Sequence, residues 1–155
     1  MKVQRPFYVV PFEPSHQEGA RFVAEELLCR ELAVQSDLSG DEDLEDVART
    51  YAPPGNLFLV ALVDGAVVAT AGLLRISDRD GELHRLYVLA AYRRQGIASA
   101  LVGRLLTFVK SRGHHRILLE IRPEMKDTLE GYWRYGFVPE SESLPRPGAF
   151  LAIRF

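Results

Sequence analysis

The sequence predicts an α/β domain with a mixed sheet, whose elements follow the order β-α-α-β-β-β-α-β-α-β-β. Three observations predict this fold. At Gly96, within residues 86–102, a strand-like apolar run changes to apolar residues at helical spacing. Residues 57–76 contain two apolar runs joined by Asp64-Gly65, the signal of a tight hairpin. A strand, a helix and another strand between residues 86 and 121 predict a right-handed crossover that joins parallel strands.

The first third of the chain predicts one strand and two helices. The strand covers Phe7 to Val10 and is stopped by prolines. Ser15-His16-Gln17-Glu18 has the form of a capping box, and a helix is expected from there to about Val34. Ser39-Gly40-Asp41-Glu42 repeats this pattern before a second apolar stripe that ends at Tyr51, just ahead of two prolines and a glycine.

The rest of the chain predicts three consecutive antiparallel strands and then alternating helices and strands. A long helix begins at Gly96 and ends near Arg112-Gly113, where the glycine suits a left-handed cap. The remaining expected elements are strands at Leu57–Val63, Ala66–Ile76, Glu82–Leu89, Arg116–Ile121, 136–138 and Ala149–Phe155, and a helix at about Glu124–Tyr135.

Composition limits the classes of protein to which this chain can belong. With 155 residues, 47% of them hydrophobic, it is long enough for one domain, expected over residues 1–155. A net charge of −2 gives no reason to expect a nucleic-acid surface. No apolar stretch suggests a secretion signal or a membrane span, so we expect a cytoplasmic protein without a membrane partner. One cysteine excludes an internal disulfide, and His114-His115, a pair expected in a solvated loop, lacks further ligands at metal-binding spacing.

The turn before the long helix has the character of a phosphate site. A helix begins with unpaired N–H groups and a partial positive charge, and here Arg93 and Arg94 lie beside them. Gly96 and Ala98 would let an anion approach the amides of residues 94–99. The alternative is that Gly96 only eases a tight turn. The Gly-x-Gly-x-x-Gly and Gly-Lys-Ser/Thr nucleotide motifs are both absent.

Arg93-Arg94-Gln95-Gly96-Ile97-Ala98 resembles the Arg/Gln-x-x-Gly-x-Gly/Ala signature of the GNAT superfamily of N-acetyltransferases, and Leu86-Tyr87-Val88 is similar to the strand that leads into it. The resemblance implies a mixed, mostly antiparallel sheet of about six to seven strands with four helices. It implies that acetyl-CoA is the acyl donor, with its pyrophosphate at the turn and its pantetheine arm between two splayed strands. The cofactor-binding residues would be Leu86, Tyr87, Val88, Arg93, Arg94, Gln95, Gly96, Ile97, Ala98 and Ser99.

Such a reaction needs a proton acceptor, because only about one alkylammonium in several thousand is deprotonated at pH 7. Strand alternation places Glu82, His84, Leu86 and Val88 on one face. Glu82 matches the position where some GNAT enzymes carry a glutamate base, so it comes first and His84 second, each acting directly or through water. The alternatives are a solvated strand end for Glu82 and a hydrogen-bonded packing residue for His84.

Tyr132 is the candidate for assisting the thiolate leaving group. Residues 132–137 resemble the family's Tyr-x-x-x-Gly-Phe ending, in which the tyrosine donates a hydrogen bond to sulfur. Full proton transfer from a tyrosine to a thiolate is uphill by about 2 kcal/mol, so charge stabilisation is the expected role. The alternative is a packing residue. Two positions depart from the family pattern: Met125 stands where many members have asparagine, and Gly131 replaces a bulky apolar residue.

Two function hypotheses follow from these residues. The first is an N-acetyltransferase that moves acetyl directly to a primary amine of a small molecule, peptide or protein. The second is a non-catalytic acyl-CoA sensor or interaction domain. The acidic run between Asp37 and Asp46 would either attract a cationic acceptor or form a solvated helix face. The loop from Glu140 to Gly148 is an expected wall of the acceptor pocket, and the oligomeric state, a homodimer included, stays open.

Overall fold

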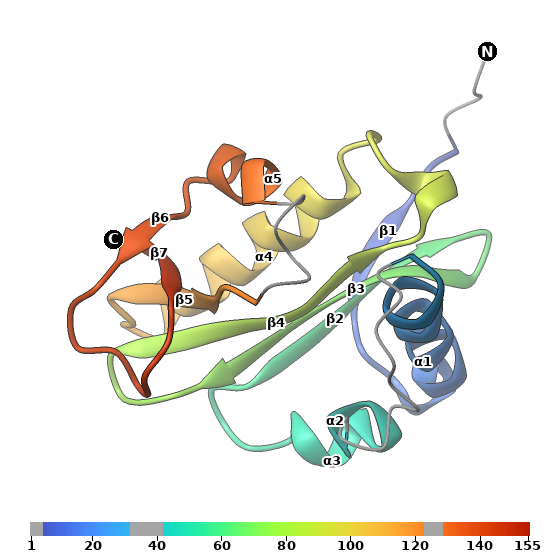
Figure 1. The fold of residues 1–155 in the computed structure, drawn as a ribbon. Helices are drawn as coiled ribbons and strands as arrows, with labels where there is room; N and C mark the ends of the chain where they lie inside the picture. Colours follow the sequence, from blue (N-terminus) through green and yellow to red (C-terminus); the bar gives the residue numbers. More distant parts are fainter. Residues whose placement is uncertain (1–4, 32–41, 123–128) are drawn as a thin grey trace.

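A computed structural model describes residues 5–31, 42–122 and 129–155. Within them, seven strands form one sheet in the order β1-β2-β3-β4-β5-β7-β6 (Figure 1). The strands β4 and β5 are parallel, and every other neighbouring pair in this order is antiparallel. The predicted α/β fold with a mixed, mostly antiparallel sheet is therefore confirmed.

The strands lie within one or two residues of their predicted bounds. They are β1 (Tyr8–Pro11), β2 (Leu57–Val63), β3 (Ala66–Arg75), β4 (Asp80–Val88), β5 (Arg116–Glu120), β6 (Val138–Glu140) and β7 (Phe150–Arg154). The Asp64-Gly65 turn joins β2 and β3 with positive φ at both residues, as a tight hairpin requires.

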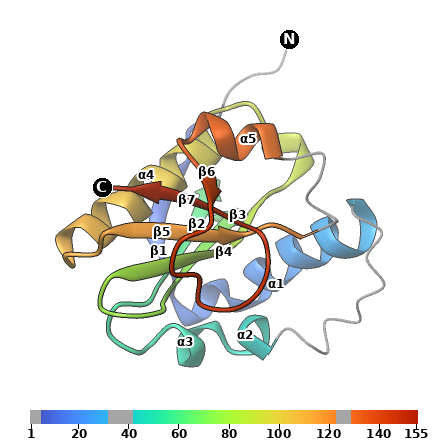
Figure 2. The same cartoon turned by 60° about the vertical axis from the view of Figure 1, so that its left-hand side comes forward.

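The helices divide into two layers, one on each face of the sheet (Figure 2). On one face, α4 (Ile97–Ser111) and α5 (Leu129–Arg134) cover the larger core, which contains Leu101, Leu105 and Phe137. On the other face, α1 (Gln17–Glu25) and α3 (Val47–Thr50) cover a smaller core around Phe58 and Val60. The remaining helical segments are η1 (Pro14–His16), η2 (Glu26–Glu31), α2 (Glu42–Glu45) and η3 (Ala90–Tyr92).

Two helix predictions need correction. The second helix is two short helices, because Asp46 leaves the helical conformation (φ −146°, ψ 80°) and its carboxylate accepts a hydrogen bond from the Arg49 amide at 3.2 Å. The first α-helix is not capped by Ser15: a 3-10 turn precedes it, where the Glu13 amide donates to Nδ1 of His16 at 3.0 Å. The expected start of the second helix near Ser39 and the ends of two others, near Val34 and Glu124, lie outside the described residues.

The predicted alternation along β4 is wrong after His84, because the strand contains a bulge. Thr70 pairs with Tyr87 and Gly72 with His84, so two steps along β3 match three along β4. Arg85 is the extra residue, with a left-handed φ of 56°. Tyr87 therefore shares a face with Glu82 and His84, whereas Leu86 and Val88 pack with the core under α4.

Candidate active site

The turn before α4 leaves the first helical amides open. Arg94 (φ 62°) and Gly96 (φ 85°) are both left-handed, which reverses the chain within a few residues. Among the described residues, no side chain caps the helix at Gly96. A Cβ built at Gly96 would meet no protein atom within 4 Å. The space beside Gly96 is therefore open, and the uncapped start of a helix is a place where N–H groups can bind a ligand's oxygen atoms.

The side chains of residues 93–99, which are predicted to bind the pyrophosphate, differ in their contacts and exposure. Nε of Arg93 donates to the carbonyl oxygen of Val88 at 3.0 Å, which ties the turn to the end of β4. Arg94 and Ser99 are exposed, and Gln95 and Ala98 are half-buried. Ile97 is buried in the core, so only its backbone is placed to contact a ligand at this turn.

The β4–β5 ladder opens next to this turn. Its pairs run from Asp80↔Arg116 to Glu82↔Leu118, and residues 83–88 of β4 have no partner in β5 within the described part of the chain. Along its other edge, β4 stays paired with β3 as far as Val88. The two parallel strands thus pair only as far as Glu82, which agrees with the splayed strands that the GNAT resemblance implied.

Glu82 lies at the point where the strands separate and is 2% exposed. Nη2 of Arg146 donates to its Oε1 at 2.7 Å and Oε2 at 3.0 Å, and Nε2 of His84 lies 2.8 Å from Oε2. Burial alone would raise the pKa of Glu82, but the hydrogen bonds and charges of His84 and Arg146 outweigh it and hold this pKa below its ordinary value. Glu82 is therefore an ionised, buried carboxylate and not a solvated strand end.

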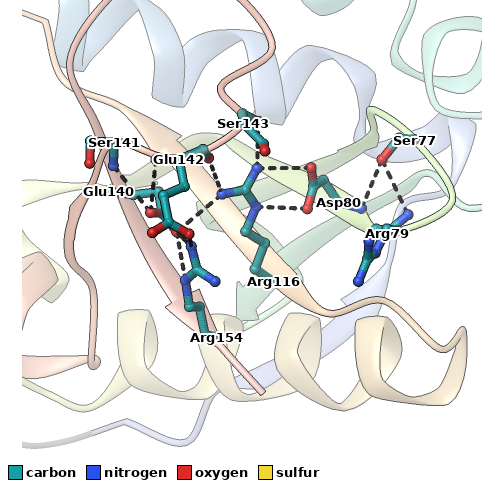
Figure 3. A network of polar contacts seen from close by, with 9 residues as sticks. All are labelled: Ser77, Arg79, Asp80, Arg116, Glu140, Ser141, Glu142, Ser143 and Arg154. Atoms are coloured by element: carbon teal, nitrogen blue, oxygen red, sulfur yellow. Dashed lines mark hydrogen bonds and ion pairs between the residues drawn. The ribbon is translucent and has the colours of Figure 1, made fainter.

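The segment between β6 and β7, which carries Arg146, is anchored by a buried arginine (Figure 3). Arg116 is 7% exposed in its side chain and donates to both carboxylate oxygens of Asp80, at 2.8 and 3.1 Å. Its other N–H groups reach the carbonyl oxygens of Glu142 (2.7 Å) and Ser143 (2.6 Å). These contacts hold the start of the segment against the paired ends of β4 and β5. The backbone that carries Arg146, whose guanidinium contacts Glu82, is therefore anchored nearby.

Tyr132 belongs to a C-cap that explains its spacing from Gly136. The Phe137 amide donates to the carbonyl oxygen of Tyr132 at 3.2 Å and the Gly136 amide to that of Trp133 at 3.0 Å, a Schellman motif with Gly136 at φ 103°. The rings of Tyr132 and Phe137 meet edge to face at 6.1 Å. Burial raises the pKa of the Tyr132 hydroxyl above its ordinary value, with smaller contributions from Tyr87 and Tyr135, so the hydroxyl is a neutral donor.

The described acidic residues of the run between Asp37 and Asp46 lie in different surroundings. Asp43 accepts a bidentate pair from Arg85, at 2.7 and 2.9 Å, next to the hydroxyl of Tyr51 at 3.4 Å. Asp46 caps α3, and Glu45 is exposed. Asp37 and Asp41 lie outside the described residues, as does Met125. Gly131 is half-buried on α5, and a Cβ there would meet nothing within 4 Å.

A family model described as the acetyltransferase (GNAT) family matches residues 21–137, more than half of the chain. The chain belongs to this family. It is 32% identical to N-acetyltransferase 8 of Rattus norvegicus over 107 residues, which cover 65% of this chain and 48% of that protein. It is 34% identical to an uncharacterized N-acetyltransferase of Mycobacterium tuberculosis over 90 residues, 58% of each. The match thus spans about half the length of N-acetyltransferase 8.

Solved structures share the GNAT fold at low sequence identity. A GNAT acetyltransferase from Staphylococcus aureus Mu50 superposes with a TM-score of 0.88 at 20% identity, covering 96% of this chain and 99% of that one. The PaiA N-acetyltransferase of Thermoplasma acidophilum, in complex with coenzyme A, gives 0.80 at 19% identity, covering 97% and 99%. An acetyltransferase from Salmonella typhimurium with acetyl-CoA gives 0.71 at 16% identity, covering 96% and 94%.

In this GNAT chain, sequence reasoning placed Glu82 and His84 together but missed the arginines that hold the site. Arg146 and Glu82 are 64 residues apart, and no local period connects them. One signal was present: Arg146 stands between Pro145 and Pro147, and two prolines fix the backbone on both sides of the side chain that they present. The prediction that His114 lies in a solvated loop is wrong, since it is 6% exposed beneath the end of α4.

The described ranges contain neither a cluster of metal ligands nor a helix that could span a membrane. No group of three or more His, Cys, Asp or Glu side chains there is placed to hold a metal ion. The helices in those ranges are all too short or too polar to cross a bilayer.

Proposed function

We propose that this protein is an acetyl-CoA-dependent N-acetyltransferase that transfers the acetyl group directly to a primary amine. The observation that carries the proposal is the open amide turn at Gly96 beside two parallel strands that separate after Glu82. Membership of the GNAT family supports it, as do the coenzyme A and acetyl-CoA named for two structures of the same fold. The cytoplasmic location stays a prediction.

The residues divide into three roles in this proposal. The amides of residues 94–99, with Arg93 and Arg94, hold the pyrophosphate, and the edge of β4 that faces away from β3 at residues 86–88 binds the pantetheine arm. Acetyl-CoA supplies an activated thioester carbon. Glu82 or His84 receives the proton of the acceptor ammonium, directly or through water, and the Tyr132 hydroxyl stabilises negative charge on sulfur as the C–S bond breaks.

Two measurements on the purified protein test donor binding and transfer. A thermal shift with acetyl-CoA, with adenosine as the ligand that lacks the diphosphate, measures occupation of the turn. A thiol-release screen over amino acids, polyamines, aminoglycosides, peptide N-termini and lysine peptides measures transfer. We expect stabilisation by acetyl-CoA and thiol release with at least one amine. Stabilisation without thiol release by any acceptor would support the acyl-CoA sensor, and the absence of stabilisation would contradict both functions.

The role of Tyr132 is tested by Tyr132→Phe against Tyr135→Phe, a matched change in the turn that directly follows the same short helix. Removing one donor to developing charge costs about 10²-fold in kcat, so we expect a loss of that order in Tyr132→Phe with little change in KM for acetyl-CoA. Tyr135→Phe, which keeps the ring contact to Tyr132, should leave turnover unchanged. Equal turnover in both variants would remove Tyr132 from the mechanism.

A further inference from the structure

Sequence reasoning left open whether Glu82 or His84 takes the proton, and the contacts between β4 and the β6–β7 segment bear on that choice. We propose that Arg146 is a positioning residue: it holds Glu82 so that this carboxylate fixes the His84 ring with its proton on Nε2, leaving Nδ1 as the atom that accepts the proton of the acceptor amine. The assignment of Nδ1 to the reaction rests on the proposed function. The arrangement of the three side chains does not.

Arg146 holds Glu82 as an anion. Both of its carboxylate oxygens accept from Nη2 of Arg146, and the same guanidinium donates from Nε to Oε2 of Glu120 on β5 at 2.7 Å. The guanidinium also lies over the Phe150 ring, 5.2 Å from its centre. Arg146 is thus held by two carboxylates and a ring, and it keeps Glu82 as an anion that only accepts hydrogen bonds.

The contact with Glu82 determines the tautomer of His84, that is, which ring nitrogen carries the hydrogen. Because ionised Glu82 has no proton to donate, the 2.8 Å contact to Nε2 of His84 requires that Nε2 carry the hydrogen. In the neutral ring, Nδ1 then holds the lone pair. No hydrogen bond to Nδ1 comes from any described residue, and the side chain is 25% exposed, against 2% for Glu82. Of the two candidate bases, His84 alone has an accepting atom not already engaged by the protein.

Charged side chains from several elements surround the imidazole ring of His84. On β4, Glu82 and Arg85 flank His84. Asp43 on α2 pairs with Arg85, and Tyr51 lies over Gly72, the β3 partner of His84. Arg146 and Glu120 complete the surroundings from the β6–β7 segment and β5. Removing Arg146 deletes a positive charge and favours the imidazolium, and removing the Glu82 charge does the opposite.

The proton balance of the step is simple. The acceptor ammonium gives one proton to Nδ1, and its nitrogen lone pair forms the bond to the acetyl carbon. The C–S bond breaks with its electron pair on sulfur, and the second proton lost by the nitrogen neutralises the thiolate. The imidazolium finally releases its proton to water, so one proton leaves for each amide formed.

The closing experiment reads the tautomer directly and without activity. A two-bond ¹H–¹⁵N spectrum of the full chain at neutral pH, with His84 assigned by its loss in His84→Gln, distinguishes an Nε2 proton from an Nδ1 proton. We expect the Nε2 form in the wild type and in the control Arg122→Gln, an exposed arginine 3.9 Å from Glu120. We expect a mixture in Glu82→Gln and Arg146→Gln, with the Nε2 form restored in Arg146→Lys. An Nδ1 proton in the wild type, or no change in Arg146→Gln, overturns the proposal.

The pH profile of kcat/KM supplies the second readout. The acidic limb should move to higher pH in Arg146→Gln and to lower pH in Glu82→Gln, each by about one pH unit. Arg146→Gln should also lose ten- to a hundredfold in kcat/KM, and His84→Gln at least a hundredfold. Limbs that move in the same direction overturn the proposal. If the Nε2 tautomer is found but no amine releases thiol, only the proposed function is rejected. If thiol is released but the ring carries its proton on Nδ1, only this inference is rejected.

Discussion

Gly96 and Gly113 lie at opposite ends of α4. They have the same left-handed backbone conformation but differ in the hydrogen bonds around them. Both have positive φ, 85° and 75°, and a Cβ built at either meets nothing within 4 Å. Gly113 closes the helix, where its amide donates to the carbonyl oxygen of Lys110 and the next amide, of His114, to that of Val109. Gly96 opens the helix where no side chain of the described residues caps the amides. A substitution at either glycine would therefore strain the backbone, but only a substitution at Gly96 would also obstruct a ligand at the turn.

Replacing each glycine by alanine separates these effects. A left-handed alanine costs about 1 kcal/mol, so Gly96→Ala and Gly113→Ala should lower the free energy of unfolding by similar amounts in urea. Only Gly96→Ala places a methyl group in the space proposed for the pyrophosphate, so it alone should raise KM for acetyl-CoA, by at least tenfold. If both variants keep the wild-type KM, the turn does not bind the donor.

Local residues of the site could be predicted, and distant ones could not. The turn at residues 93–99 is contiguous, so its glycine, its arginines and the change of period at Gly96 are visible in the sequence. Glu82 and His84 were found by alternation and by resemblance. Arg146 and Arg116 were missed because their partners lie 64 and 36 residues away, and an arginine in a loop gives no sign of the carboxylate that it binds.

Strand β4 determines which side chains face the candidate site. Its bulge at Arg85 turns Tyr87 to the face of Glu82 and His84, and it turns Leu86 and Val88 to the core. A strict period of two cannot reveal a bulge, and by residue type alone Leu86, Tyr87 and Val88 are compatible with either face of the sheet. The strand bounds and the sheet class were therefore predictable, whereas the faces beyond His84 were not.

A buried threonine stabilises the bulge from the neighbouring strand. Thr70 is 1% exposed, and its hydroxyl donates to the carbonyl oxygen of Arg85 at 2.7 Å. Thr70→Val keeps the shape and deletes this donor, so the free energy of unfolding should fall by about 1–2 kcal/mol. Thr107→Val is the matched control: Thr107 is exposed on α4, and its hydroxyl only donates to a carbonyl of its own helix at 3.1 Å. An equal loss in both variants in urea would contradict a special role of Thr70.

At the scale of the whole molecule, ion pairs join segments that the two cores leave apart. Arg116 connects the start of β5 to β4 and to the β6–β7 segment, and Glu140 also accepts from Nε of Arg154 at 2.7 Å. Arg85 joins the bulge to α2 through Asp43. Burial raises the pKa of Asp43 and of Glu140, but their hydrogen bonds and partner charges, with those of Glu82, hold all three pKa values below the ordinary 3.8 and 4.5.

These depressed pKa values fix the sign of the pH dependence. A carboxylate whose pKa is lower in the folded state contributes stability that is complete above its ordinary pKa and is lost as pH falls through the folded value. The three carboxylates should therefore leave the free energy of unfolding nearly level above about pH 5 and lower it below about pH 4.5. Burial of His114 lowers the pKa of its imidazole, so it adds a separate loss as pH falls through about 6.5. Urea unfolding of His114→Gln, monitored by circular dichroism at several pH values, measures the carboxylate part of the curve, and a steady decline that begins near pH 6 in this variant would contradict the carboxylates as its cause.

Arg116→Met tests how much one buried arginine contributes to the free energy of unfolding and to its pH dependence. Removing one partner of a buried ion pair costs about 3–5 kcal/mol, because Asp80 and Glu140 then keep buried charge with fewer donors. We expect that loss at pH 7 and a smaller one at pH 3.5, where Glu140 begins to protonate in both proteins and the arginine has less charge to stabilise. Arg5→Met breaks a pair whose side chains are 64% and 69% exposed, so it should change stability by under about 1 kcal/mol at both pH values. A loss in Arg116→Met that is the same at both pH values would mean that packing of the arginine stem, and not its charge, holds β4, β5 and the β6–β7 segment together.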